Sequence, residues 1–442
     1  MMELKGKRVM VVGLGVSGRA AARFLARRGA SLVLTDRNAG AAVSDLPSGE
    51  MHLGFESASW LKGVDLVVAS PGVPRDSILL REAVARDIAV IGELELACSF
   101  VRAPIVGITG TNGKSTVTTM IGGILKAAGK NVFVGGNLGT PLIEAVAQDL
   151  DALVIEISSF QLEWIDKFRA HVAVHLNLTD DHFERYRDLE DYGRAKARLF
   201  ENQGAGDWAI LNRDDPNVWK LRLAMRSQVV GFGFSAAPPG GHAIWPDTTL
   251  LFFDVGGRRG RLDISRFTIP GRHNLSNAMA AAAAALAMDI DPHAIEEGLA
   301  QFKPLAHRIE LVREWRGVKF IDDSKGTNVG AVVEALDAVS TPVILIAGGL
   351  DKGGDYAPLR KPLSDKVKLA ILIGSARDKM RAALDGATQI EVVEKLADAV
   401  KRAAEAAQSG DTVLLSPACS SFDQFRDYAE RGNLFKELVR AL

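Results

Sequence analysis

The residues with the clearest chemical meaning form one short run, Gly110-Thr111-Asn112-Gly113-Lys114-Ser115-Thr116. The run follows an apolar segment typical of a strand (105–109) and opens a segment that favours a helix (114–128). A Gly-Lys-Ser-Thr run in that context is typical of a phosphate-binding loop, whose amides surround the phosphates. The lysine then reaches the β and γ oxygens, and the serine hydroxyl is a ligand for Mg²⁺. Ile108 stands where the usual pattern has its first glycine, yet the rest of the run predicts nucleotide binding.

Two further polar residues follow apolar segments in the same part of the chain. Glu156 lies inside the apolar run 153–157, and His182 closes Asn-Leu-Thr-Asp-Asp-His just beyond the segment 171–176. Ligands of open parallel sheets bind beyond the carboxyl ends of the strands, so we expect both side chains at the same edge as the loop. A carboxylate there can hold Mg²⁺ directly or through water. Taken singly, Glu156 is also compatible with an edge-strand acid and His182 with an ordinary loop histidine.

The last third of the chain contains three polar turns, each directly after a predicted strand. The turns 322–328, 348–354 and 416–422 follow the segments 318–321, 343–347 and 412–415. Polar, glycine- or serine-rich turns at three strand ends predict a site for a small polar ligand. Any one of them is equally compatible with a turn that binds nothing.

A glycine motif near the N-terminus suggests a second nucleotide site. Residues 13–18 fit Gly-x-Gly-x-x-Gly directly after the predicted strand 8–12, and Asp36 ends the next strand, where a ribose-binding acid is expected. The glycines would let the backbone meet a diphosphate at the start of a helix, where amides favour anions. The motif fits a nicotinamide cofactor or any nucleotide diphosphate, and it also fits a tight turn without a ligand.

The elements that must position these residues alternate along the whole chain. Short β-branched runs alternate with Ala-, Leu- and Arg-rich helical stretches, which predicts α/β layers with mainly parallel sheets. We predict three domains: a Rossmann-like domain (1–93), a central P-loop domain of the ATPase type with a mainly parallel sheet (94–303), and a second Rossmann-like domain (304–442). Segment 238–260 predicts turns and short antiparallel strands, and the alanine-rich segment 278–287 predicts a packed core helix.

Composition favours a soluble enzyme. The 442 residues include 53 Lys and Arg against 54 Asp and Glu, which argues against a chain built to bind nucleic acid or an acidic membrane surface. Two cysteines, Cys98 and Cys419, cannot form a disulfide framework and indicate a reducing compartment. The longest apolar stretch, 278–288, is too short to span a bilayer, and the N-terminus lacks the layout of a signal peptide. We therefore expect a cytoplasmic protein that neither binds nucleic acid nor enters a membrane. We also expect a monomer.

Longer motifs give the chain a resemblance to a known family over nearly its whole length. They are Thr-Gly-Thr-Asn-Gly-Lys-Ser-Thr (109–116), Glu-Ile-Ser-Ser-Phe-Gln-Leu-Glu (156–163), Asn-Leu-Thr-Asp-Asp-His (177–182), Gly-Arg-His-Asn-Leu-Ser-Asn (271–277), His-Arg-Ile-Glu (307–310) and Asp-Asp-Ser-Lys-Gly-Thr-Asn (322–328). With them the chain resembles the Mur ligases of peptidoglycan precursor synthesis. Ser-Pro-Ala-Cys-Ser-Ser-Phe-Asp-Gln-Phe (416–425) resembles most the members that add D-glutamate.

The resemblance implies four groups of site residues. ATP is expected at Gly110, Thr111, Asn112, Gly113, Lys114, Ser115 and Thr116, with Asn277, Arg308, Asp323 and Lys325. Catalytic roles fall to Lys114, Glu156, His182 and Lys196; two Mg²⁺ ions are expected on Ser115, Glu156, His182 and a carbamylated Lys196. The nucleotide-sugar substrate is expected at Ser17, Asp36, Arg37, Ser70, Gly72, Asn137 and Gln161. D-Glutamate is expected at Thr327, Lys352, Ser421, Phe422 and Tyr428.

The implied reaction joins D-glutamate to UDP-N-acetylmuramoyl-L-alanine through an acyl phosphate, with release of ADP and phosphate. On this reading the first glycine motif serves the uridine diphosphate, and hinge motion is expected near residue 303. His182 is a better metal ligand than general base, which leaves the base unassigned.

Other functions fit part of the sequence. A nicotinamide-dependent dehydrogenase fits the glycine motif and Asp36 but leaves the phosphate loop unexplained. A non-catalytic nucleotide switch fits the loop but predicts that Lys114→Ala affects partner binding alone. Within the ligases, the alternatives are enzymes that add another amino acid, or a folylpolyglutamate synthase; the chain has no Asp-Asn-Pro-Arg segment of the kind expected for diaminopimelate addition.

Overall fold

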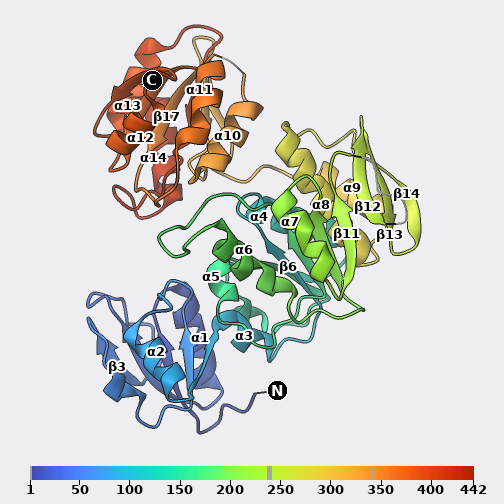
Figure 1. Ribbon diagram of the computed structural model, residues 1–442, viewed down its shortest axis with the longest axis vertical. Coiled ribbons are helices and arrows are strands. Elements are labelled where there is room, and N and C mark those ends of the chain that lie inside the picture. Colours follow the sequence, from blue (N-terminus) through green and yellow to red (C-terminus); the bar gives the residue numbers. More distant parts are fainter. Residues whose placement is uncertain (1, 236–240, 341) are drawn as a thin grey trace. The chain divides into compact units, whose positions relative to one another are not determined.

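The computed structural model describes residues 2–235, 241–340 and 342–442. They contain three β-sheets flanked by helices, coloured along the chain in Figure 1. The chain divides into two compact units, each described by itself below. The first unit comprises Met1–Asn177, Tyr192–Phe267 and Asn277–Gln301, and the second comprises Leu178–Asp191, Thr268–Ser276 and Phe302–Leu442.

The first sheet is a five-stranded parallel sheet with the order β3-β2-β1-β4-β5, a Rossmann-like arrangement. Its strands are β1 (Arg8–Val12), β2 (Ser31–Asp36), β3 (Glu50–Leu53), β4 (Leu66–Ala69) and β5 (Ala89–Gly92). Its helices are α1 (Val16–Arg27), η1 (Ala58–Leu61), α2 (Ile78–Ala85) and α3 (Glu93–Cys98). The central strand β1 is apolar and buried on both faces, as a parallel sheet covered by helices requires. The carboxyl end of β1 therefore opens toward the glycine motif.

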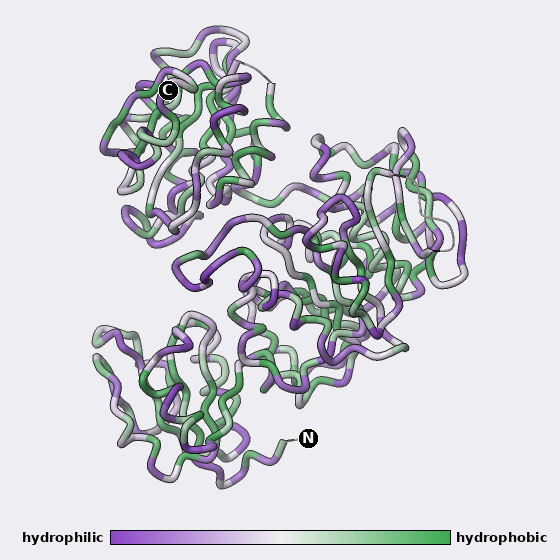
Figure 2. The backbone as a smooth tube through the Cα atoms, viewed as in Figure 1, coloured by the Kyte–Doolittle hydropathy of each residue, from purple (hydrophilic) through white to green (hydrophobic). Residues whose placement is uncertain are grey.

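The second sheet carries the phosphate loop and has nine strands in the order β14-β13-β12-β11-β10-β9-β6-β8-β7. Its parallel strands are β6 (Ile105–Thr109), β7 (Val132–Gly136), β8 (Ala152–Glu156), β9 (Val172–His175), β10 (Trp208–Asn212), β11 (Gln228–Phe232) and β12 (His242–Asp247). The strands β13 (Leu250–Val255) and β14 (Arg258–Asp263) extend it antiparallel, as the turn-rich sequence predicted. The central strands β6, β8 and β9 are buried along their whole length, and Figure 2 colours the backbone by hydropathy.

Helices cover both faces of this sheet. They are α4 (Lys114–Ala127), η2 (Leu142–Ala145), α5 (Ser159–Leu162), α6 (Leu189–Ala197), η3 (Arg198–Phe200), α7 (Pro216–Trp219), η4 (Lys220–Ala224), α8 (Arg272–Ala287) and α9 (Pro292–Ala300). The alanine-rich part of α8 is buried throughout, which confirms the predicted core helix. Small side chains there let neighbouring elements approach closely.

The third sheet has six strands in the order β15-β16-β20-β17-β18-β19. Its strands are β15 (Glu310–Trp315), β16 (Val318–Asp322), β17 (Val343–Gly348), β18 (Val367–Ile373), β19 (Gln389–Val392) and β20 (Thr412–Leu415). β15 pairs antiparallel with β16, and the other strand pairs described in this sheet are parallel. The helices are α10 (Val329–Ala338), η5 (Ala357–Leu359), α11 (Arg360–Lys366), α12 (Arg377–Leu384), α13 (Leu396–Ala406) and α14 (Tyr428–Ala441). Apolar clusters fill both faces of this sheet.

The predicted fold class, α/β with mainly parallel sheets, is confirmed. Five strands (β3, β7, β11, β15 and β19) were not predicted. Four of them, β3, β7, β15 and β19, lie at sheet edges, and the interior strand β11 is only five residues long and contains a glycine. The domain boundaries near residues 93 and 303 stay a prediction. None of the described helices combines the length and the apolar character needed to cross a bilayer.

Candidate active site on the parallel sheets

The phosphate loop joins β6 to α4, and its backbone shape depends on glycine. Gly113 has φ +82°, and a Cβ atom there would lie 2.5 Å from the Asn277 side-chain oxygen. Asn277 of the first unit is therefore next to the loop, as expected for an ATP contact. The Lys114 ammonium donates to the carbonyls of Gly110 (3.0 Å) and Thr111 (2.8 Å), so it lies folded over the loop. A polyphosphate placed in the loop can draw this ammonium away from the two carbonyls.

Asn177 fixes the loop from the end of the neighbouring strand β9. Its side-chain oxygen accepts from the Asn112 amide (2.8 Å), and its side-chain nitrogen donates to the Asn112 carbonyl (3.2 Å). The Asn177 carbonyl also accepts from the Thr111 amide (3.0 Å). Three hydrogen bonds from one residue therefore hold the centre of the loop open. Asn177 had no predicted role, although it begins the hexapeptide that ends at His182.

Glu156, at the end of β8, connects the loop to a residue from another segment. Its carboxylate accepts from the Ser115 hydroxyl (2.6 Å) and from the Asn137 side-chain amide (2.6 Å). The Asn137 backbone amide also donates to the Glu156 carbonyl (2.8 Å), which fixes Asn137 at this strand end. Glu156 is only 3% exposed. A carboxylate and a hydroxyl in contact offer the hard oxygen ligands that Mg²⁺ prefers.

Two basic side chains are buried behind the loop. Lys196, on α6, is 1% exposed; its ammonium donates to the Gly110 carbonyl (2.8 Å) and lies over the Tyr192 ring. His175, at the end of β9, is fully buried, and neither ring nitrogen has a hydrogen-bond partner among the described residues. Burial, reinforced by the nearby Lys196 charge, lowers the pKa of His175 to about 3, so its imidazole is neutral at physiological pH.

The glycine motif opens onto a cavity of about 430 Å³ at the carboxyl ends of the first sheet. Six of the seven residues expected to bind the nucleotide-sugar line it: Ser17, Asp36, Arg37, Ser70, Gly72 and Asn137. This volume lies within the usual range for small-molecule sites. The seventh, Gln161, is not part of its lining; its side chain caps α5 by accepting from the Ser158 amide (2.9 Å).

Side chains fix the backbone around this cavity. A Cβ atom at Gly18 would lie 1.9 Å from the Gly13 carbonyl, so only glycine lets the loop close here. The Ser70 hydroxyl donates to that same carbonyl (2.6 Å), and Asp36 accepts from the Leu14 amide (2.7 Å). Arg37 forms a bidentate pair with Glu56, which also lines the cavity. Asp36 thus shapes the loop as well as facing the cavity.

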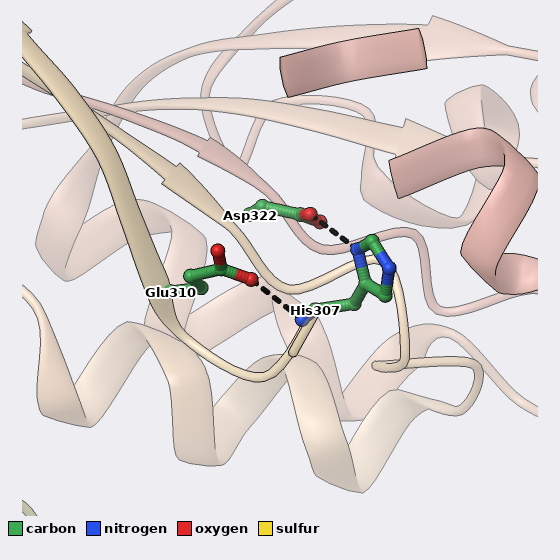
Figure 3. Close-up of side chains that lie close together, drawn as sticks. All are labelled: His307, Glu310 and Asp322. Carbon is green, nitrogen blue, oxygen red and sulfur yellow. Dashed lines mark hydrogen bonds and ion pairs between the residues drawn. The ribbon is translucent and has the colours of Figure 1, made fainter. Parts of the chain in front are cut away.

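In the second unit, His307 lies in a buried network shown in Figure 3. Its Nδ1 atom lies 2.6 Å from an Asp322 oxygen, and its backbone amide donates to Glu310 (2.9 Å). The Lys436 ammonium donates to the same Glu310 oxygen (2.6 Å) and lies 3.9 Å from Asp322. Because a lysine already supplies the positive charge among these carboxylates, the cluster is an ion-pair network that fixes the neighbouring residues Arg308 and Asp323.

Arg308 and Asp323, two of the expected ATP contacts, lie next to this network. The Asp323 carboxylate accepts from the Ser416 hydroxyl (2.7 Å) and from the Ile309 amide (3.3 Å). Burial raises the pKa of Asp323 to about 7, although the Arg308 charge opposes the shift. The Arg308 Nε atom is buried and makes no hydrogen bond to the described residues.

The residues expected to bind D-glutamate all belong to the second unit. The Lys352 ammonium donates to Asp181 (3.1 Å), and Ser421 is buried whereas Phe422 is 68% exposed. Thr327 lies in the turn that follows β16, where its amide donates to the Lys325 carbonyl (2.9 Å). Tyr428 begins α14, and its ring lies beneath the Lys325 ammonium, 5.3 Å from the ring centre.

His182 lies in the Leu178–Asp191 segment of the second unit. Its Nδ1 atom is 3.0 Å from Glu184, and its Nε2 atom is 3.6 Å from Asp181. The side chain is about a quarter exposed, so one ring nitrogen can be turned to a metal ion once its carboxylate contact is released. The backbone at His182 has φ +59°, a left-handed conformation that few residues adopt.

Comparison with known proteins places these features in a family. Three family models match successive parts of the chain: "Mur ligase MurD-like, N-terminal domain" (7–92), "Mur ligase middle domain" (108–285) and "Mur ligase, glutamate ligase domain" (307–419). A UDP-N-acetylmuramoylalanine–D-glutamate ligase of Geotalea daltonii is 46% identical over the whole chain and 99% of its own length. The chain belongs to the Mur ligase family. The corresponding ligase of Syntrophus aciditrophicus is 44% identical, with the same coverage.

Solved structures agree with the Mur ligase fold. The pseudomurein peptide ligase type C of Methanothermus fervidus superposes with a TM-score of 0.63, at 21% identity, over 99% of this chain and all of that one. Mur ligases use ATP, which implies Mg²⁺, and the Ser115–Glu156 pair has the oxygen ligands that this ion requires.

In this Mur ligase, the sequence did not reveal three residues, Asn177, His307 and Arg431, that contact the loops carrying the candidate site residues. Asn177 and His307 belong to motifs that the sequence displays, but nothing in a motif shows which backbone atoms its asparagine or histidine will contact. For Arg431 the sequence does contain an indication of burial, because Arg431 lies on the same face of a helical segment as the apolar residues Phe435 and Val439. A cation on an apolar face predicts a buried partner.

Proposed function

We propose that this Mur ligase joins the amino group of D-glutamate to the carboxyl group of UDP-N-acetylmuramoyl-L-alanine, at the expense of ATP. The main support is the set of relatives that carry this activity in their names and match the chain from end to end at 44–46% identity. A ligase that makes a peptidoglycan precursor from soluble substrates acts in the cytoplasm, and we propose a monomer.

ATP binds at the loop Gly110 to Thr116, where Lys114 leaves its two carbonyls for the β and γ phosphates. The substrate carboxylate must approach the γ-phosphate, and two unit charges of the same sign about 4 Å apart repel by roughly 4 kcal/mol at an effective dielectric near 20. Mg²⁺ held by Ser115 and Glu156 supplies charge neutralisation when bound. Lys114 contributes a fixed positive charge at the same place. Asn277, next to the loop, is a further proposed nucleotide contact. Arg308, Asp323 and Lys325 stay predicted ATP contacts.

The nucleotide-sugar binds in the cavity of the glycine motif. The start of α1 presents backbone amides to the diphosphate, and Asp36, Arg37 and Ser70 offer side chains to the nucleoside. Asn137 lines this cavity, and its side-chain amide also donates a hydrogen bond to the Glu156 carboxylate. The substrate's reactive end is proposed to lie on the Asn137 side of the cavity, where Gln161 would contact it.

The reaction has two steps. The substrate carboxylate oxygen attacks the γ-phosphorus, the bond to the ADP oxygen breaks, and an acyl phosphate forms. The neutral amine of D-glutamate then attacks the acyl carbon, the bond from that carbon to the phosphate oxygen breaks, and the nitrogen gives up one proton as phosphate leaves and the amide forms. Thr327, Lys352, Ser421, Phe422 and Tyr428 hold the amino acid, and its carboxylate displaces Asp181 from the Lys352 ammonium.

Lys196 would carry a carbamate in the active enzyme and would be a ligand of a second Mg²⁺, for which His182 is the other proposed ligand. Its burial against the Gly110 carbonyl supports a role at the loop, since a buried lysine is uncommon without one. Lys196→Ala should lose most turnover at saturating Mg²⁺. Near-normal turnover of that variant would contradict this role.

The decisive experiment measures phosphate release and product mass with defined substrates. Release is expected only when ATP, UDP-N-acetylmuramoyl-L-alanine and D-glutamate are all present, and the product should gain the mass of one glutamyl residue. A panel of amino acids and acceptors separates this activity from other ligases and from folylpolyglutamate synthesis. Lys114→Met is the matched negative control, because it removes only the ammonium. Turnover that does not depend on the amino acid would overturn the proposal.

A further inference from the structure

The guanidinium of Arg431, on α14, is 1% exposed and contacts two loops at once. Its Nε and Nη2 atoms donate to the Ser324 hydroxyl (2.9 Å) and carbonyl (2.8 Å). Its Nη1 and Nη2 atoms both donate to the Cys419 carbonyl (3.3 Å), and Nη1 also donates to the Ser420 carbonyl (3.4 Å). One side chain thereby joins the turn after β16 to the turn after β20.

These two turns carry residues assigned above to different substrates. The turn after β16 holds Asp323 and Lys325 for ATP and Thr327 for the amino acid, and the turn after β20 holds Ser421 and Phe422. Two direct contacts also join them, from the Ala418 amide to the Gly326 carbonyl (2.9 Å) and from the Ser416 hydroxyl to Asp323 (2.7 Å). A small shift of one turn against the other would separate the amino acid from the nucleotide contacts.

The buried positive charge of Arg431 is bound by neutral groups. No ion pair joins it to a carboxylate in the described part of the chain, and all five hydrogen bonds go to neutral oxygens. Burial lowers the pKa of Arg431 to about 10, so it stays positive at neutral pH. The carboxylates of Asp423, Asp322 and Asp323 lie near enough to oppose this lowering of the pKa, but none of them forms an ion pair with Arg431. D-Glutamate carries two carboxylates, for which a positive charge beneath the binding turn is favourable.

We propose that Arg431 is a positioning residue for the amino-acid substrate: it aligns the Ser421 turn with the Asp323–Thr327 turn and supplies the positive charge beneath the dicarboxylate. This inference rests on the proposed function for the identity of the amino acid. It assigns no contact with substrate to Arg431, because both turns lie over its guanidinium.

The test compares Arg431→Lys and Arg431→Met with the wild type. Lysine keeps the charge, but one nitrogen cannot serve both turns, so the KM for D-glutamate should rise about tenfold while kcat stays within about threefold. The KM values for ATP and the nucleotide-sugar should change less than twofold. Methionine removes charge and hydrogen bonds and should raise the amino-acid KM further. Free guanidinium added to Arg431→Ala should lower that KM again, a response that loss of packing alone does not give.

Arg313→Met is the matched control, because the Arg313 guanidinium also donates to two carbonyls, those of Val439 and Arg440 at the other end of α14, outside these turns. It should lower the melting temperature without a selective change in the amino-acid KM. The wild type is first measured on the amino-acid panel, which shows which amino acid the enzyme uses. The variants are then measured on that amino acid, so that the test of Arg431 does not depend on the substrate being D-glutamate. An unchanged amino-acid KM in folded Arg431→Lys, or an equal rise of all three KM values, overturns the inference.

Discussion

At the scale of single residues, Asn177 determines the shape of the phosphate loop. Its side chain makes two hydrogen bonds to Asn112, one in each direction. In Asn177→Ala both are lost, and at 0.5–1.5 kcal/mol each we expect about tenfold weaker binding of Mg-ADP. Isothermal titration checks this value. Asn202→Ala, which removes two side-chain hydrogen bonds to carbonyls away from the loop, should bind Mg-ADP as the wild type does. Equal affinity of the Asn177 and Asn202 variants would contradict the assignment.

His175 predicts a pH dependence of stability at the same scale. Its folded-state pKa of about 3 lies below the ordinary value near 6.5. Between pH 6.5 and pH 3, His175 therefore binds a proton in the unfolded chain but stays neutral in the folded protein. The wild type therefore loses stability between pH 6.5 and pH 3. His175→Leu removes this loss, and its advantage in free energy of unfolding should be about 2 kcal/mol larger at pH 5 than at pH 8. Urea unfolding at the two pH values measures the difference, and equal advantages would show that His175 does not cause it.

At the scale of elements, the short helix α3 carries two buried acids with opposite expected behaviour. Glu93 accepts one amide, from Ile143 (2.7 Å), and its other oxygen has no partner among the described residues. Burial raises the pKa of Glu93 to about 7, so the folded protein holds a proton that the unfolded chain has lost above pH 4.5. The stability that this proton contributes is complete below pH 4.5 and is lost as pH rises through 7. Glu93→Gln should be about 1–3 kcal/mol more stable than the wild type at pH 8, with little difference at pH 4.5.

Glu95, on the same helix, is the control for that prediction. Its carboxylate accepts the amides of Asp166, Lys167 and Phe168, which are strong hydrogen bonds because the acceptor is charged. Glu95→Gln weakens them and should lower stability at pH 8. Urea titrations of both variants at the two pH values give the comparison. If the two substitutions change stability in the same direction at pH 8, burial does not explain the behaviour of Glu93.

Elements and their local motifs were accessible from the sequence, whereas contacts between segments were not. The phosphate loop and the strand before it are encoded within a dozen consecutive residues, so periodicity and glycine positions suffice to predict them. Glu156 and its strand follow from the same rule. The contacts of Asn177 with Asn112, 65 positions earlier in the chain, depend on which strands become neighbours. Arg431 reaches Ser324 over 107 positions, a pairing that no local pattern specifies.

At the scale of the whole molecule, Asn137 connects the two substrate sites that we propose within the first unit. It lines the cavity of the glycine motif, and its side chain donates to Glu156, which in turn accepts from Ser115 of the phosphate loop. A nucleotide-sugar that moves Asn137 would therefore move a hydrogen-bond partner of Glu156, the carboxylate that we propose as a metal ligand. Coupling of this kind is reciprocal, because each ligand changes the affinity of the other by the same factor.

The coupling can be measured as a ratio of affinities. In the wild type, the dissociation constant of UDP-N-acetylmuramoyl-L-alanine should fall several-fold when a non-hydrolysable Mg-ATP analogue is present, and the same factor should appear when the order of addition is reversed. Asn137→Ala should bring that factor close to one, because it removes the side-chain contact with Glu156. Ser17→Ala, which changes the cavity without touching Glu156, should weaken nucleotide-sugar binding and keep the factor. If Asn137→Ala retains the wild-type factor, the two sites communicate by another route, since the chain through Asn137, Glu156 and Ser115 has then been cut without effect.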